Sequence, residues 1–147
     1  MESGKRRVKI SWVVFSIASL ALVYIFQRFN YAEMVYSITS IDLARQPNGV
    51  FAINRTIRLL INDTLCMILI YALFQKRSYL KLSGIIFGFE VLVLLPLYLW
   101  AKLSMEGPSE ISSPLLSPIH RMIVNPLLMI VLIAALYYQQ YILAKAK

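Results

Sequence analysis

The sequence has little from which a catalytic or metal-binding centre could be built. It contains one cysteine, Cys66, and one histidine, His120, among 147 residues. A single cysteine excludes an internal disulfide. The sequence also lacks the Cys/His spacing of a metal site, a phosphate-binding loop and any nucleotide-binding motif. We therefore expect no metal ion, no other cofactor and no catalytic residue.

Apolar residues are abundant by contrast. They make up 59% of the chain, and the mean hydropathy is +0.68. A membrane-spanning helix needs about 20 predominantly apolar residues. Runs of roughly that kind cover residues 10–26, 57–74, 82–101 and 122–143. The sequence therefore predicts an all-α integral membrane protein, a four-helix transmembrane bundle that forms one domain over residues 1–147.

Acidic residues are scarce, since the chain has seven of them against fifteen basic residues. The basic residues are unevenly distributed along the sequence. Nine of them lie before the first run, between the second and third, or after the last: Lys5, Arg6, Arg7, Lys9, Lys76, Arg77, Lys81, Lys145 and Lys147. The positive-inside rule then places both termini in the cytoplasm. Because this distribution is an orientation signal, with attraction to anionic lipid headgroups, we expect membrane lipid as a partner and no nucleic acid.

The two outer connections are expected to differ in structure. Residues 29–54 carry apolar side chains at helical spacing, with Asn30 and Glu33 placed as a capping box. We predict a short amphipathic helix here, ended by residues 46–49, that either lies on the outer membrane face or forms a lid on the loops. Residues 104–118 are polar and rich in proline, so this outer loop should have little regular structure.

Two Arg-x-x-x-Asn patterns, at residues 58–62 and 121–125, fall at the outer ends of the second and fourth runs. Four residues make about one helical turn, so each pattern forms a stripe, and both stripes should lie at the same depth. With their neighbours they predict one polar cluster: Arg58, Asn62, Asp63, His120, Arg121 and Asn125. It either ties two helices together or forms a pocket or docking site. A lone carboxylate in the membrane costs about 2–3 kcal/mol, so Asp63 should pair with Arg121.

The third run contains an acid and a packing motif. Glu90 lies near its middle, and an intramembrane acid is a functional hypothesis by default. Gly84 and Gly88 form a G-x-x-x-G pattern, which favours close helix packing. Glu90 is about 200° around the helix from Gly88, so the two face opposite sides. We therefore expect neighbouring helices of the chain to cover the glycines, and a partner protein or a second copy to cover Glu90.

Three segments of the chain resemble a known family. The sequence Arg-Leu-Leu-Ile-Asn-Asp-Thr-Leu at 58–65, residues 113–128 and the Ala-Leu-Tyr-Tyr-Gln at 135–139 resemble small membrane proteins associated with exosortase systems of Bacteroidetes-type bacteria. The chain resembles the proteins associated with the exosortase F system most, and those associated with the X system second. An exosortase is a membrane-embedded cysteine transpeptidase that processes the C-terminal sorting signals of exported proteins. The resemblance implies a multi-pass protein of the bacterial inner membrane.

The resemblance further implies a non-enzymatic accessory subunit that docks the exosortase or guides its substrate at the outer leaflet. The expected partner is an exosortase-type enzyme or a second copy of the chain. A small oligomeric ion-coupled transporter that uses Glu90 and Asp63 is an alternative. A minimal cysteine transpeptidase centred on Cys66 is another, although Cys66 should lie about 13 Å inside the outer boundary, away from His120. Met-Ile-Leu follows Cys66, where an exosortase nucleophile is followed by small residues.

Overall fold

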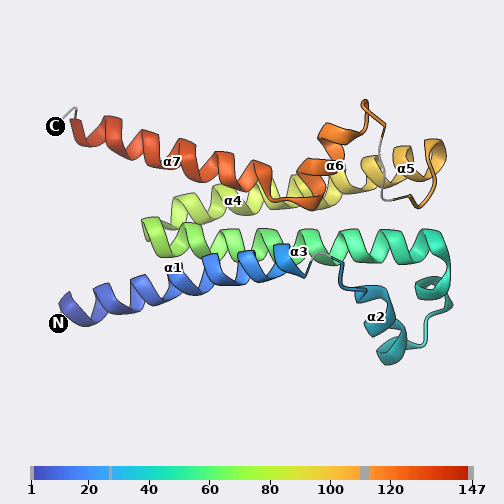
Figure 1. The fold of residues 1–147 in the computed structure, drawn as a ribbon. Helices are drawn as coiled ribbons and strands as arrows, with labels where there is room; N and C mark the ends of the chain where they lie inside the picture. Colours follow the sequence, from blue (N-terminus) through green and yellow to red (C-terminus); the bar gives the residue numbers. More distant parts are fainter. Residues whose placement is uncertain (1, 27, 110–112, 146–147) are drawn as a thin grey trace.

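The structure of the chain, a computed structural model, describes residues 2–26, 28–109 and 113–145. Every regular element in these ranges is helical, which confirms the expected all-α class (Figure 1). The elements in order are α1 (Glu2–Ile25), α2 (Tyr31–Thr39), the 3-10 helix η1 (Asp42–Arg45), α3 (Pro47–Phe74), α4 (Arg77–Phe89), the π-helix η2 (Glu90–Leu94), α5 (Leu95–Met105), α6 (Ser117–Val124) and α7 (Leu127–Lys145). In Figure 1, α1 begins and α7 ends at the same end of the molecule, and α2 and α6 lie toward the opposite end.

Helix α3 is the centre of the fold, since it contacts each of the other elements. It begins with Pro47 in its first turn, where the missing N–H of proline would be unpaired anyway, and it ends at Gln75, which adopts the left-handed conformation with φ 52°. A helix of 28 residues is about 42 Å long, whereas the hydrocarbon core of a bilayer is about 30 Å thick. Helix α3 is therefore long enough to cross the bilayer and to extend beyond it beside α2.

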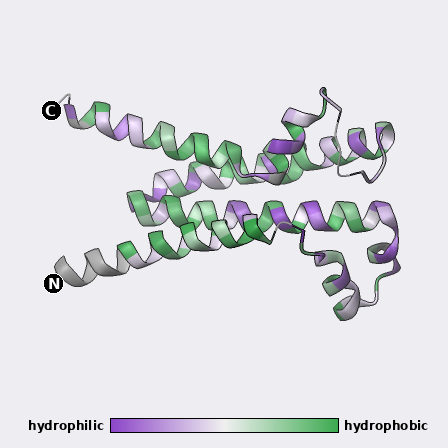
Figure 2. Cartoon of the chain, viewed as in Figure 1, coloured by the Kyte–Doolittle hydropathy of each residue, from purple (hydrophilic) through white to green (hydrophobic). Residues whose placement is uncertain are grey.

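The helices have the length and surface of membrane-spanning segments. Helix α3 and the continuous segment Arg77–Met105 are each long and apolar enough to cross, and the bent pair α6–α7 would make a third span. The apolar part of α1, Ile10–Ile25, is shorter. Large apolar side chains are exposed along these helices, among them Trp12, Phe15, Ile85, Leu92, Trp100 and Val131. Figure 2 shows residues of high hydropathy along α3 and α7. Exposed apolar surface of this extent is typical of a protein that faces lipid.

The helix formed by the third apolar run contains a wider turn near its middle. Five residues, Glu90–Leu94, form a π turn, and the N–H of Leu95 donates to the carbonyl of Glu90, five residues earlier. Pro96 follows directly, and its ring would clash with the carbonyl four residues earlier in a regular α-helix. The wider turn accommodates the ring, so the segment Arg77–Met105 continues as one helix. Glu90 therefore opens an irregular turn in the interior of the fold.

The fourth apolar run is broken where we expected a continuous helix over residues 122–143. The segments Ser117–Ile123 and Leu127–Leu143 are inclined by 72°. Asn125, between them, is extended, with φ −114° and ψ 142°. A residue before proline is driven out of the helical conformation because the proline Cδ collides with its backbone. Pro126 therefore ends α6 at Val124, and the expected start of the span at Met122 is wrong.

The amphipathic helix expected between the first two apolar runs is present as α2, but its capping and its end differ from expectation. The side chain of Asn30 makes no capping hydrogen bond within α2. Asn54 of α3 supplies the acceptor, because its Oδ1 receives the N–H of Ala32 at 2.9 Å and its Nδ2 donates to Asn30 Oδ1 at 3.1 Å. Helix α2 ends at Thr39, followed by Ser40 in the left-handed conformation. The proline expected to end it, Pro47, opens α3 instead.

Two apolar clusters form the core. One joins α3 to α7 through Cys66, Ile70, Phe74, Met129, Leu132 and Leu136. The other joins α3 to α5 and α6 through Phe51, Leu59, Leu95, Tyr98 and Ile123. The polar side chains considered below lie between and beside these two clusters.

Candidate functional site

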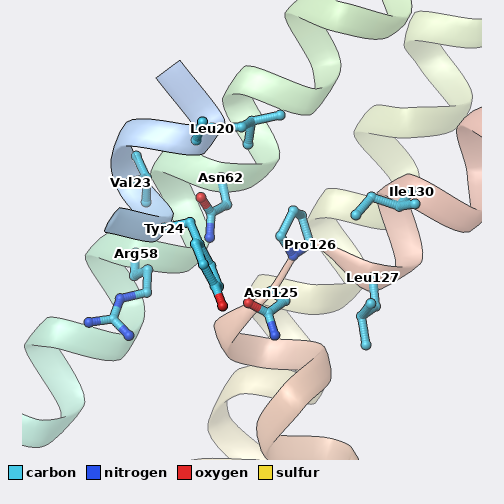
Figure 3. Close-up of a pocket in the computed structure, with 10 residues that line it drawn as sticks. Leu20, Val23, Tyr24, Arg58, Asn62, Asn125, Pro126, Leu127 and Ile130 are labelled. Carbon is cyan, nitrogen blue, oxygen red and sulfur yellow. The ribbon is translucent and has the colours of Figure 1, made fainter. Parts of the chain in front are cut away.

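A cavity of about 450 Å³ opens between α1, α3 and the break between α6 and α7 (Figure 3). Its walls are mostly apolar, with polar groups contributed by α3, the α6–α7 break and Tyr24. The residues that line it are Leu20, Ala21, Val23, Tyr24, Arg58, Asn62, Asn125, Pro126, Leu127 and Ile130. An apolar cavity with a few convergent polar groups is the usual form of a binding site.

Three of the six residues in the expected polar cluster meet at this cavity. Arg58 and Asn62 are one helical turn apart on α3, as expected, and are only 7% and 5% exposed. Asn125 reaches the cavity from the other side, although Arg121 and Asn125 form no stripe, because Asn125 has left the helix. The extended backbone that Pro126 imposes therefore shapes one wall of the cavity. In Figure 3 the phenol of Tyr24 extends toward Asn125.

The other three residues of the expected cluster lie elsewhere. Arg121 is exposed, while Asp63 is completely buried, and the side chain that contacts Asp63 is Glu90. The expected pair of Asp63 with Arg121 is therefore wrong. It assumed a continuous fourth helix, whereas the bend at Pro126 carries α6 and Arg121 away from the bundle interior. His120 is hydrogen-bonded to Tyr98 of α5 at 2.5 Å.

Glu90 was expected to face a partner, and this expectation is also wrong. Its side chain is 1% exposed, and it lies within the chain against Asp63, which is 0% exposed. A sequence signal for this contact exists. Helices α3 and α4 form an antiparallel hairpin, and the two acids lie at nearly equal distances in sequence from its connection. Residues so placed lie at the same height along the axes of the two helices. Comparing the second apolar run with the fourth alone does not reveal this pairing.

The glycine pattern does not mark a close helix contact within the described part of the chain. A Cβ atom added at Gly84 would meet only the end of Met67, at 3.9 Å, and one added at Gly88 would meet nothing within 4 Å. The expectation that neighbouring helices cover both glycines is therefore wrong. The acid and the glycines do face different sides of the helix, but it is the acid that the chain itself covers.

A second polar group connects α5 to the loop that follows it. Lys102, which is fully buried, donates to Glu106, and the backbone N–H of Ser113 donates to the other carboxylate oxygen of Glu106 at 2.8 Å. These hydrogen bonds, chiefly that from Lys102, lower the pKa of Glu106 to about 2. The carboxylate therefore stays ionised across the physiological pH range and holds the loop to α5. Tyr98 and Lys102 were not predicted as members of a polar site, because an aromatic and a lysine at a span end are typical of the membrane interface. The spacing of four residues between Lys102 and Glu106 is a signal that indicates their pairing.

Cys66 lies in surroundings unlike those of a reactive thiol. It is completely buried in the apolar cluster between α3 and α7, next to residues such as Ile70 and Met129. Reactive cysteines occupy electropositive and partly exposed positions. His120 is bonded to Tyr98, which belongs to the other cluster. The fold therefore places the thiol and the imidazole in different parts of the core.

The described residues offer no group of three or more His, Cys, Asp or Glu side chains that could hold a metal ion. The cavity and the Asp63–Glu90 contact are two places where polar side chains gather between the described helices. Comparisons of the chain with protein-family models, with characterised proteins and with solved structures give no match.

Proposed function

We propose that the chain is a non-enzymatic accessory subunit of an exosortase-type protein-sorting system in a bacterial inner membrane. In this proposal the cavity of Figure 3 receives a segment of the exosortase or of its substrate. The observation that carries the proposal is the convergence of two of the three segments with family resemblance. Arg58 and Asn62 come from the first segment, and Asn125, Pro126 and Leu127 come from the second, and all five line the cavity.

The chemistry of the cavity suits a polypeptide partner within the outer leaflet. The amides of Asn62 and Asn125 each offer both donors and acceptors. A backbone group at the end of a partner helix has no water to bind in the hydrocarbon region, where an unpaired group costs several kcal/mol. The surrounding apolar walls, such as Leu20 and Ile130, match the apolar side chains of such a helix. The cavity can therefore satisfy both the side chains and the exposed backbone of a partner segment.

The proposal includes four crossings with both termini in the cytoplasm. Helix α1 begins and helix α7 ends at the same end of the molecule (Figure 1). This arrangement is consistent with the positive-inside rule, which assigns the basic residues within 5–9, 76–81 and 145–147 to the cytoplasmic side. We expect reporters fused after Lys147 or within residues 76–81 to report the cytoplasm, and reporters within 104–118 to report the outside. A cytoplasmic signal from residues 104–118 would reverse the orientation and place the cavity at the inner leaflet.

Docking at the cavity is tested by site-specific photo-crosslinking in native membranes. A crosslinker at Ile130, which lines the cavity, should capture a membrane polypeptide of exosortase type, and the variants Asn62→Leu and Asn125→Leu should reduce that product at least several-fold. The matched control is the adjacent Val131, which is exposed and does not line the cavity. Equal products from both positions, or products with lipid alone from Ile130, would refute docking at this site.

A second function, ion-coupled transport by an oligomer, is favoured by one observation, the buried contact of Asp63 with Glu90. The double variant Asp63→Asn, Glu90→Gln separates the two functions. Sorting of exported proteins should continue in this variant if the chain docks its partner through the cavity, since neither acid lines it. Loss of the biological activity, with normal protein level and normal crosslinking at Ile130, would favour transport.

A further inference from the structure

Asp63 and Glu90 are in contact although no hydrogen-bond donor in the described ranges lies between their carboxyl groups. Asp63 on α3 and Glu90 at the start of η2 are both buried where these two elements pack together, and their carboxyl groups interact. All four oxygens are buried, and none of them receives a hydrogen from any group in the described ranges. Hydrogen-bond donors are normally found for buried oxygens, because an unsatisfied one costs about 1–3 kcal/mol and more if it is charged. Four such oxygens in one contact indicate that a ligand binds between them.

Two ionised carboxylates would not remain in contact here. Like charges a few ångströms apart in surroundings of low dielectric repel each other strongly, and paired carboxylates in proteins hold a proton between them. No cationic side chain in the described ranges donates a hydrogen bond to either acid. The Cys66 thiol also lies close enough to interact with both of them.

We propose that Asp63 and Glu90 form a proton-binding site in which one proton is shared between the two carboxyl groups. The protonated group donates an O–H···O hydrogen bond to its ionised neighbour, so the pair carries one negative charge in place of two. Hydrogen bonds to an ionised acceptor are about twice as strong as neutral ones. The bond fastens α3 to the π turn that Glu90 opens, so the irregular turn and the proton site support each other.

A proton fits this site better than a metal ion does. A divalent cation such as Ca²⁺ takes about 6–8 oxygen ligands, and Mg²⁺ takes about six. The described residues provide no third His, Cys, Asp or Glu to complete such a set at the pair. A proton requires only two oxygen atoms, which Asp63 and Glu90 supply in direct contact.

The sign of the expected pH dependence follows from the proton count. The folded chain binds one more proton than the unfolded chain, in which both acids are ionised at neutral pH. Stability should therefore decrease as the pH rises, with the unfolding equilibrium constant growing about tenfold per pH unit until the folded pair loses its proton. At about pH 4 the two unfolded acids together also bind one proton, so the proton counts of the two states are equal there and the slope should reach zero.

The test combines infrared spectroscopy with unfolding of the full chain in detergent. Wild type should show the stretching band of one protonated carboxyl group per chain at neutral pH, and this band should disappear at alkaline pH. In Asp63→Asn or Glu90→Gln the new amide N–H donates to the remaining carboxylate and takes the role of the proton. Each variant should therefore fold, lose the band at neutral pH and lose the tenfold stability change per pH unit.

The exposed acids Glu33 and Asp42 supply matched controls, because Glu33→Gln and Asp42→Asn should keep both the band and the pH dependence. A wild-type spectrum without a protonated carboxyl at neutral pH would overturn the proposal. A band that persists in both amide variants, or a pH dependence unchanged in them, would overturn it as well. Addition of Na⁺, K⁺ or Ca²⁺ at constant pH should not displace the band, and displacement by one of them would assign the site to that cation.

Discussion

Replacing Pro126 with alanine is expected to join α6 and α7 into one continuous helix and to remove the cavity wall that Asn125 provides. Alanine restores the missing N–H donor and releases Asn125 from its extended conformation. The 72° bend should then straighten. We expect the partner crosslink from Ile130 to fall at least tenfold, because Asn125 would return to the helix and leave the cavity.

The straightening can be measured as a distance between spin labels at residues 119 and 138, in a Cys66→Ala background that removes the native thiol. A straight helix would separate these positions by about 28 Å, and the bent pair holds them closer. Pro118→Ala is the matched control, because Pro118 lies in the first turn of α6, where its missing N–H breaks no helical hydrogen bond. An unchanged distance in Pro126→Ala would show that packing, and not the proline, sets the bend.

Truncating Ile70 to alanine is expected to destabilise the fold by about 2–5 kcal/mol, the range for removing a large buried side chain and leaving a cavity. Ile70 is completely buried between α3 and α7, next to Cys66 and Met129. The matched variant Ile85→Ala removes the same atoms from a side chain that is 69% exposed on α4. It should change the stability by no more than about 0.5 kcal/mol.

Both isoleucine variants can be compared by reversible unfolding in mixed detergent. A loss of no more than about 0.5 kcal/mol in Ile70→Ala would mean that α7 does not pack on α3 through this cluster. A loss in Ile85→Ala as large as that in Ile70→Ala would instead indicate a protein contact on the exposed face of α4. This face also carries Gly88, beside which an added Cβ would meet nothing.

The proposed docking cavity and the proposed proton site are adjacent along α3, since Asn62 and Asp63 are consecutive residues. Consecutive residues on a helix point about 100° apart, so Asn62 lines the cavity while Asp63 turns to Glu90. The two sites can therefore be tested independently. Variants of Asn62 should reduce partner binding and leave the infrared band unchanged. Variants of Asp63 should change the band and leave the cavity unchanged.

Several features of this protein follow from its sequence alone. The length of the apolar runs dictates helices, because a backbone in lipid must satisfy its own hydrogen bonds. The helical spacing of apolar residues within 29–54 predicted α2, and the presence of this helix was confirmed, although it ends earlier than expected. The stripe of Arg58 and Asn62 was also found, because residues one turn apart on an uninterrupted helix keep their relation in any fold. Local periodicity is sufficient to predict which residues share a face wherever the helix is regular.

Only the tertiary structure decided what the polar side chains contact. The partner of Asp63 depended on which helices are neighbours and at what level, and no local pattern contains that information. The stripe of Arg121 and Asn125 failed because one proline redirected the chain, which changed a helical surface into a cavity wall. Tyr98 looks like an interfacial residue until the fold brings His120 to it. Lys102 and Glu106, by contrast, are one helical turn apart, so their pairing is local. In a membrane protein nearly every helix surface is apolar, so the sequence identifies the few polar groups, and packing alone determines which of them meet.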